Sequence, residues 1–211
     1  MNERLIVTGI GTGIGKTLVS SIFVEALDGD YWKPIQAGSL DATDSNRVRA
    51  LIRDPETRIH PECYRLTEAI SPHAAARRQG IHINIADMSL PESSRPLVIE
   101  GAGGVMVPLN DSQLMVDFFA HLRAPVVLVS QHYLGSISHT LLSAESLRLR
   151  KIPVLGLVFN GNPNSESEDV ILKHTGLPML LRIQPEKQWT SETTRKYAEL
   201  LRNIIKKHEL V

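Results

Sequence analysis

The stretch RLIVTGIGTGIGKT, which runs from Arg4 to Thr17, decides the fold of this 211-residue chain. An apolar run at residues 5–7 leads into a glycine-rich loop, and the loop closes on Gly-Lys-Thr before an apolar, helix-like segment. Such a loop lets backbone N–H groups surround a phosphate, while Lys16 reaches the β- and γ-phosphates and the Thr17 hydroxyl coordinates Mg²⁺. A glycine-rich turn without a ligand is the alternative, but the Lys-Thr pair at the helix start favours a phosphate loop.

The spacing within this loop differs from the standard phosphate-loop pattern, which places four residues between the first glycine and the Gly-Lys pair. Here five residues, 10–14, separate Gly9 from Gly15. The loop also lacks the early lysine typical of partition-type ATPases, because Ile10 and Gly11 occupy that region. The sequence therefore indicates a longer variant of the loop.

Composition narrows the class of protein further. The 23 basic and 23 acidic residues give a formal net charge of zero, so nothing indicates a nucleic acid or an acidic membrane as partner. The single cysteine, Cys63, excludes an internal disulfide and is typical of a reducing compartment; no cysteine-centred motif marks it as a nucleophile. We find no signal peptide and no apolar run long enough to cross a bilayer, and we expect a cytoplasmic protein.

Short apolar runs alternate with amphipathic segments along the chain. Strands are expected at residues 5–8, 31–36, 97–100, 126–130, 154–159 and 179–183, and helices at 16–27, 44–53, 112–121, 137–149, 166–174 and 191–208. Several of these strands are continuous apolar runs, which is typical of strands covered on both faces. The sequence predicts a single α/β domain over residues 1–211, with a doubly wound, mostly parallel sheet flanked by helices, like that of P-loop NTPases. Residues 55–91 are irregular in pattern and are interpreted as an excursion on the substrate side.

Two charged residues accompany the second expected strand. Lys33 stands in the stretch WKPIQAG, where it could neutralise a transferring phosphoryl group or could be a surface lysine before a proline. Asp44 could ligate Mg²⁺, although its position at the start of an expected helix favours an N-cap. Ligands of doubly wound sheets bind beyond the carboxyl ends of the strands, which is where both residues are expected.

The third expected strand ends at Glu100 and breaks into the glycine-rich residues 101–104. An acidic residue at the tip of an apolar strand can hold Mg²⁺ opposite Thr17. The alternative is a carboxylate that ends the strand in water. The glycines that follow favour the metal site, because they let another group approach closely.

Two further segments carry weaker signals. Residues 135–138 begin an expected helix whose free N–H groups and hydroxyls could bind a carboxylate, although a serine cap is the simpler interpretation. The fifth expected strand runs into Asn160 and Gly161, where the amide could pair with a base edge, or the pair could form a common turn. The residues alone leave both questions open.

Taken together, these motifs resemble those of the dethiobiotin synthetases in order and spacing. They are TGIGTGIGKT at residues 8–17, WKPIQAG at 32–38, Asp44, SPHAAA at 71–76, IEGAGG at 99–104, LGSISHT at 134–140 and FNGN at 159–162. The resemblance extends from Leu5 to about Glu186. The joint pattern is far more specific than a phosphate loop alone.

The resemblance implies an activity of the biotin pathway, carried out by a homodimer. Such enzymes close a ureido ring on 7,8-diaminononanoate with CO₂ and MgATP, and they release dethiobiotin, ADP and phosphate. One amine takes up CO₂ to give a carbamate, ATP phosphorylates the carbamate, and the second amine displaces phosphate. No protein nucleophile is needed, because the substrate amine attacks, and no nucleophilic triad is found in the sequence.

The resemblance also implies roles for individual residues. The metal ligands are Thr17, Asp44 and Glu100, and the catalytic residues are Lys33, Lys16 and Thr12. The nucleotide site comprises Gly13, Ile14, Gly15, Lys16, Thr17, Leu18, Asp44, Glu100, Gly101, Ala102, Gly103, Asn160, Gly161, Gln184, Pro185 and Glu186. The substrate site comprises Lys33, Ala37, Leu134, Gly135, Ser136, Ile137 and Ser138, and the partner subunit contributes the helix start.

The chain departs from the family pattern at a few positions. Gly11 stands where an acidic residue is usual, Ala37 stands where a serine or threonine is usual, and a proline common near residue 184 is offset to Pro185. Two alternatives share the expected fold. One is an ATP-dependent amide ligase of the cobyrinate type, which usually carries a glutaminase domain. The other is a P-loop switch or partitioning ATPase that acts through a protein partner.

Overall fold

A parallel sheet forms the centre of the computed structural model, which describes residues 4–208. Residues 1–3 and 209–211 of the expected domain lie outside the described residues. The strands are β1 (Arg4–Gly9), β2 (Asp30–Trp32), β4 (Ile59–His60), β6 (Leu97–Glu100), β7 (Val126–Gln131), β8 (Val154–Asn160) and β9 (Met179–Ile183). Their order is β4-β2-β6-β1-β7-β8-β9, and every neighbouring pair is parallel. The carboxyl ends of these strands therefore meet at one edge.

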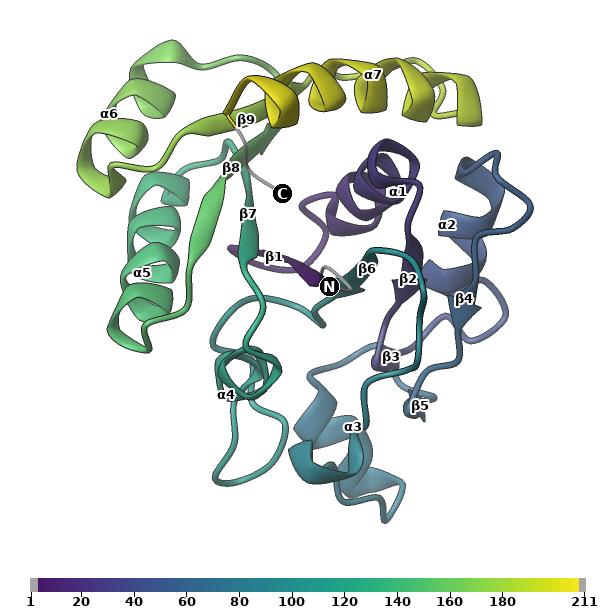
Figure 1. The fold of residues 1–211 in the computed structure, drawn as a ribbon. Coiled ribbons are helices and arrows are strands. Elements are labelled where there is room, and N and C mark those ends of the chain that lie inside the picture. Colours follow the sequence, from purple (N-terminus) through teal and green to yellow (C-terminus); the bar gives the residue numbers. More distant parts are fainter. Residues whose placement is uncertain (1–3, 209–211) are drawn as a thin grey trace.

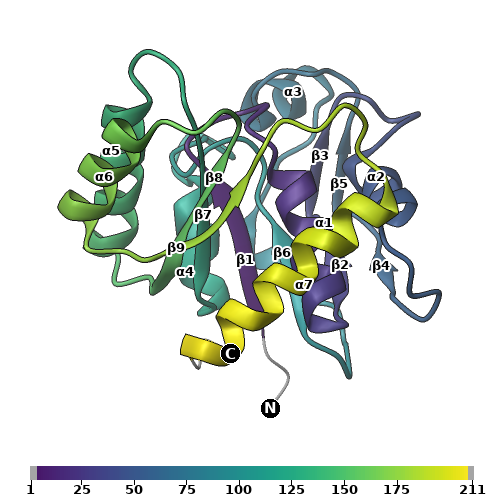
Figure 2. The same ribbon diagram turned by 90° about the horizontal axis from the view of Figure 1, so that it is seen from above.

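Helices cover both faces of this sheet, as Figures 1 and 2 show. The helices α1 (Lys16–Leu27), α2 (Asp44–Leu51) and α7 (Ser191–His208) pack together on one face. The other face is covered by α4 (Met115–Leu122), α5 (Ser136–Leu149) and α6 (Ser165–Thr175). The predicted doubly wound architecture is confirmed. Within residues 4–208, no helix is both long and apolar enough to cross a membrane.

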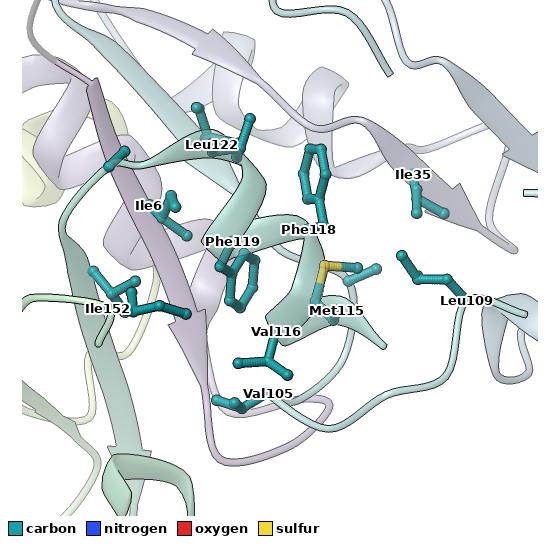
Figure 3. Packing of buried hydrophobic residues seen from close by; sticks show 14 of the residues in the cluster. Ile6, Ile35, Val105, Leu109, Met115, Val116, Phe118, Phe119, Leu122 and Ile152 are labelled. Carbon is teal, nitrogen blue, oxygen red and sulfur yellow. The ribbon is translucent and has the colours of Figure 1, made fainter. Parts of the chain in front are cut away.

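The core beneath α4 holds the loop-bearing strand β1 in place. Figure 3 shows the apolar side chains of α4 spreading between Ile6 of β1 and Ile35. Phe118 and Phe119 are fully buried there, and the Phe118 ring meets Trp32 edge-on at 6.2 Å between centroids. Burying a side chain of this size contributes about 1.5–3 kcal/mol. This packing fixes β1 and β2, the strands that lead into the glycine-rich loop and into Lys33.

The expected strand 31–36 is wrong, because two separate strands occupy it. The first, β2, ends at Trp32 in the large sheet, and β3 (Ile35–Ala37) pairs instead with β5 (Tyr64–Leu66) in a second, two-stranded sheet. Pro34 lies between them and has no N–H to continue a ladder. Its carbonyl instead accepts hydrogen bonds from the backbone N–H groups of Cys63 and Tyr64.

The expected helices 112–121 and 44–53 are also partly wrong. Residues 112–114 are not helical, because the Asn110 side chain accepts hydrogen bonds from the N–H groups of Ser112 and Gln113 and Leu114 forms an isolated β-bridge with Pro108. The helix begins only at Met115. The other helix, α2, ends at Leu51 rather than at residue 53. The remaining expected helices and strands agree with the structure to within one residue at each end.

The irregular stretch 55–91 contains more structure than its pattern indicates. It includes β4, β5, the short helix α3 (Pro72–Arg78) and the 3-10 turn η1 (Ile85–Asp87). The helix α3 packs against the small β3–β5 sheet. This excursion thus forms a wall beside the carboxyl edge of the main sheet.

Candidate functional site

The phosphate loop lies between the end of β1 and the start of α1 and is tied to the end of β8. Its carbonyl at Ile14 accepts a hydrogen bond from Asn160 Nδ2 at 2.9 Å. The neighbouring Gly15 has φ +93°, and a Cβ there would lie 2.2 Å from the same nitrogen. Any larger residue would both strain the backbone and push Asn160 away. Glycine at this position therefore lets the loop close against β8.

Four side chains converge where β2, β6 and the two helices α1 and α2 meet. The Thr17 hydroxyl lies 2.9 Å from Asp44 Oδ1 and 3.0 Å from Glu100 Oε1. Lys33 Nζ bridges the two carboxylates, at 2.7 Å from Asp44 Oδ2 and 2.9 Å from Glu100 Oε1. These residues are far apart in sequence. The parallel topology brings them together, because the ends of β2 and β6 and the starts of α1 and α2 meet at one edge of the sheet.

The charges of this cluster stabilise one another. Burial alone would lower the pKa of Lys33, but the charges of Glu100 and Asp44 outweigh it and raise that pKa. Burial likewise opposes the ionised form of Asp44, and the charge of Lys33 overcomes it and lowers the pKa of this carboxyl. Lys33 is thus a cation and Asp44 an anion at neutral pH.

Lys16 is held in a different environment. Its Nζ donates to the carbonyl of Gly11 at 2.7 Å. Burial and the positive charge of Lys33 together lower its pKa to about 8, although the charges of Glu100 and Asp44 act in the opposite direction. The two lysines give the site a concentration of positive charge suited to anionic phosphates.

The donor set fits a magnesium ion. Two carboxylates and one hydroxyl present oxygen atoms within hydrogen-bond distance of each other, and oxygen is the ligand that Mg²⁺ prefers. Mg²⁺ is typically held by one or two carboxylates and by phosphate oxygens rather than by a full protein cage. Accordingly, residues 4–208 contain no group of three or more His, Cys, Asp or Glu side chains placed to hold a metal.

The N-cap interpretation of Asp44 is wrong. Thr43 caps α2 instead, since its Oγ1 accepts a hydrogen bond from the N–H of Asn46 at 3.1 Å. The Asp44 carboxylate is left to face Thr17 and Lys33. Lys33, for its part, is only 5% exposed, so the interpretation as a surface lysine is wrong as well.

A cavity of about 620 Å³ opens over this cluster. Of the predicted site residues, it is lined by Thr12, Gly13, Gly15, Lys16, Thr17, Leu18, Lys33, Ala37, Asp44, Glu100, Ala102, Gly103 and Asn160. The structure therefore brings most of the predicted nucleotide and catalytic residues to one place. Ile14, Gly101 and Gly161 lie next to lining residues in sequence but are not part of the lining.

Sequence reasoning missed several residues of this cavity. Gln36 lines it and accepts a hydrogen bond from the N–H of Asp44 through Oε1, at 3.3 Å. Arg47, one helical turn after Asp44, lines it too, and this spacing could have revealed it. Residues 69–72 of the irregular stretch line it as well; Ser71 and Pro72 belong to the SPHAAA motif of residues 71–76, whereas Ala69 and Ile70 carried no local signal. Tyr31, a residue of the apolar core, donates from its hydroxyl to Glu100 Oε2 at 2.9 Å.

The predicted substrate segment at the start of α5 lies in a different cavity. Leu134, Gly135, Ser136, Ile137 and Ser138 line a space of about 910 Å³ and do not line the phosphate-loop cavity. No side chain caps this helix, so the serine-cap interpretation is wrong; the N-cap is Gly135, with φ +99°. Within one subunit, the two parts of the expected substrate site are therefore separate.

The turn Gln184–Pro185–Glu186 also lies outside the lining of the main cavity. It is fixed by Tyr197 on α7, whose hydroxyl accepts from the N–H of Gln184 at 3.2 Å and donates to Glu186 Oε1 at 3.0 Å. Lys196 also reaches Glu186, at 3.2 Å. Glu186 is thereby engaged with α7, and the turn directly follows Ile183, which pairs with Asn160 at the end of β8.

Solved structures of low sequence identity share this fold. A ParA family ATPase from Chlorobium tepidum has a TM-score of 0.58 at 14% identity, over 99% of this chain and 94% of that one. The septum site-determining protein MinD from Pyrococcus horikoshii, in complex with Mg-ADP, has a TM-score of 0.58 at 13% identity, over 99% and 96%. This likeness concerns the architecture alone.

Sequence comparisons are more specific. A family model described as an AAA domain matches residues 3–193. The ATP-dependent dethiobiotin synthetase BioD of Cytophaga hutchinsonii is 52% identical over 197 residues, which cover 93% of this chain and 95% of that protein. Enzymes of the same name from Brucella ovis (49% identical, 89% of this chain and 91% of that one) and Rhodopseudomonas palustris (47%, 92% and 92%) are also similar. The chain belongs to the family of ATP-dependent dethiobiotin synthetases.

Proposed function

We propose that this chain closes the ureido ring of dethiobiotin on 7,8-diaminononanoate, using CO₂ and MgATP. The observation that carries the proposal is the convergence of Lys33, Thr17, Asp44 and Glu100 beside the phosphate loop. The sequence identity of 52% and 49% to two ATP-dependent dethiobiotin synthetases supports the same activity.

The nucleotide is proposed to lie with its phosphates on the loop. Residues 13–18 comprise the end of the loop and the first turn of α1, where free backbone N–H groups and the helix dipole favour negative charge. The segment Gly101–Ala102–Gly103 would border the phosphates. Asn160 and Gly161 would contact the adenine base. We assign Gln184, Pro185 and Glu186 to the nucleoside side, as the family resemblance implies.

Thr17, Asp44 and Glu100 would hold Mg²⁺, which supplies positive charge to the phosphates of bound ATP. Their oxygen atoms already lie close together, as the distances of 2.9 and 3.0 Å from the Thr17 hydroxyl show. Gln36 supports this arrangement by accepting from the N–H of Asp44.

The chain's own residues then stabilise three successive steps. One substrate amine attacks CO₂, forms a C–N bond and loses a proton, which leaves an anionic carbamate. A carbamate oxygen attacks the γ-phosphorus and ADP departs. The second amine then attacks the carbonyl carbon and loses a proton to water, the C–O bond to phosphate breaks, and the ring closes as phosphate leaves. Lys33 and Lys16 offset the repulsion between carbamate and phosphate, and Thr12 lies in the lining beside them. Ala37, which lines the cavity, would lie beside the substrate but has no hydroxyl to form a hydrogen bond with it.

A homodimer would complete the substrate site. The surface around α5 exposes large apolar side chains, namely Met106, Tyr133, Leu134, Leu142 and Leu149, of which Leu134 is fully exposed. Exposed apolar side chains of this size are typical of an interface. We propose that a second copy covers it, so that Leu134–Ser138 of one subunit receive the substrate carboxylate at the site of the other.

Phosphate release from MgATP tests the function, measured with and without 7,8-diaminononanoate and bicarbonate while the product is followed by mass. Release that depends on the diamine, with a product that gains one carbonyl and loses two hydrogens, is the expected result. Release that is indifferent to the diamine would contradict the proposal. It would instead favour a switch or partitioning ATPase, whose fold this chain shares.

A further inference from the structure

The buried hydroxyl of Tyr31 makes a contact that the proposed reaction does not use. It donates to Glu100 Oε2 at 2.9 Å. The other carboxylate oxygen, Oε1, faces Thr17 at 3.0 Å and Lys33 at 2.9 Å. The two oxygens of Glu100 are thus divided: one faces the reaction site and the other faces Tyr31.

The sheet register explains why Tyr31 reaches this oxygen. Its strand β2 runs parallel to β6, and Tyr31 lies opposite Val98. Glu100 follows Val98 by two residues, so both side chains of β6 point to the same face of the sheet. A diagonal neighbour at this spacing is within reach of a tyrosine side chain.

Burial makes the contact consequential. Tyr31 is 0% exposed and Glu100 is 1% exposed. The Tyr31 ring lies in the apolar cluster with Val7, Val48 and Val98, which offer no hydrogen bond. Without the Tyr31 hydroxyl, Oε2 would lose its partner in a region closed to water, and the carboxylate would be free to rotate.

We propose that Tyr31 is a positioning residue for metal binding: its hydroxyl holds Glu100 Oε2 and thereby keeps Oε1 directed at Thr17 and the ion. This inference rests on the proposed function of Glu100 as a ligand of Mg²⁺. Hydrogen-bond partners of metal ligands fix ligand orientation, and their loss typically weakens metal binding by about 10- to 100-fold.

The test uses Tyr31→Phe, which removes the hydroxyl and keeps the ring in the core. Tyr64→Phe is the matched control, since among residues 4–208 the Tyr64 hydroxyl bonds to the backbone of Asn84 alone, and Tyr64 does not line the main cavity. Binding of Mn²⁺ in the presence of ADP is measured by electron paramagnetic resonance. Binding of ADP in excess chelator is measured by calorimetry. Glu100→Gln is included to test the ligand itself.

The expected result is metal binding weakened about 10-fold or more in Tyr31→Phe, with ADP binding in chelator unchanged and Tyr64→Phe like the wild type. If Tyr31→Phe binds Mn²⁺ as the wild type does while Glu100→Gln does not, the positioning role is overturned and the metal site stands. If Tyr31→Phe weakens ADP binding equally with and without metal, the hydroxyl is merely structural and the inference is overturned too. If Glu100→Gln binds Mn²⁺ normally, the proposed metal site fails, and the inference with it.

Discussion

The phosphate-loop cavity and the start of α5 are both predicted to bind parts of one substrate, yet they differ in how complete they are within a single chain. The first is closed: Lys16, Thr17, Lys33 and Glu100 are all less than a tenth exposed and are bonded to each other or to the loop. The second is open, and Leu134 beside it is fully exposed. We propose from this difference that a single chain builds the nucleotide site, whereas substrate selection needs a second copy.

Removing the cation at the centre of the closed region has the largest expected effect. In Lys33→Ala, turnover should fall by at least about 10²–10³-fold, because a preorganised charge beside the transferring phosphoryl group is lost. ATP binding should change modestly, since the loop remains. Phosphate release and ATP calorimetry measure the two effects. Arg53→Ala, at an exposed arginine of the surface, serves as control. Normal turnover in Lys33→Ala would remove this lysine from the mechanism.

The open region is tested next, by placing a charge on its apolar surface. Leu142→Asp should convert dimers to monomers and lower diamine-dependent turnover by roughly 10-fold or more, because buried unpaired charge at an interface costs several kcal/mol. Nucleotide binding should persist. Sedimentation and calorimetry give the two measurements. Leu200→Asp is the matched control, because Leu200 is also an exposed leucine but lies on α7. A Leu142→Asp variant that stays dimeric would place the interface elsewhere.

A third prediction concerns Asp30, the first residue of β2, whose other end leads into Lys33. Asp30 accepts hydrogen bonds from the N–H of Arg58 at 2.9 Å and from Ser93 Oγ at 2.7 Å. Burial would raise the pKa of Asp30, but these bonds and the nearby His60 outweigh it and lower that pKa. The ionised carboxylate therefore stabilises the fold at neutral pH. Asp30→Asn should lower the free energy of unfolding by about 1–2 kcal/mol at pH 7.

The effect of Asp30→Asn on the free energy of unfolding should depend on pH. A carboxyl whose pKa is lower in the folded state stabilises the fold above its unfolded value of about 3.9, and this contribution is lost as the pH falls through the folded value. The difference between wild type and Asp30→Asn in urea unfolding should therefore shrink as the pH drops below about 4. A difference that stays constant down to pH 2 would show that the charge of Asp30 is not responsible.

The smallest effect is expected at the cap of α2. Thr43→Ala removes the acceptor for the N–H of Asn46 and should lower the free energy of unfolding by about 1 kcal/mol. Thr43→Ser keeps a hydroxyl and should restore most of the loss. Chemical denaturation of the three proteins measures this. Because Asp44 follows the cap directly, Thr43→Ala can also be tested for the Mg²⁺ concentration that it needs for turnover. A raised requirement in the folded variant would show that the closed region depends on this helix start.

The closed region could be predicted from sequence because each of its parts is local. Gly-Lys-Thr after an apolar strand and an acidic residue at a strand tip are short patterns, and a parallel sheet brings strand ends together. Asp44 was read wrongly by local rules alone, since an aspartate at a helix start usually caps it, and only the tertiary structure shows Thr43 in that role.

Other features depend on distant pairing and left no local signal. The break at Pro34 follows from the pairing of β3 with β5, a strand hidden in the irregular stretch. Tyr31 reads as an ordinary core aromatic, and its contact with Glu100 depends on the register of β2 and β6. The separation of Leu134 from the phosphate loop likewise depends on three-dimensional arrangement, because both follow strands that are neighbours in the sheet.

The hydrogen bond between Asn160 and Ile14 also has a consequence for the order of synthesis. The two residues are 146 positions apart, and β1 itself pairs with β6 and β7, which are made much later. Such long-range contacts must form before the loop takes its final shape, and they slow folding. A nascent chain that has emerged only as far as β7 therefore has the whole Gly-Lys-Thr motif but lacks the strand that closes it. The first binding motif to leave the ribosome is thus among the last parts of the molecule to become competent for nucleotide.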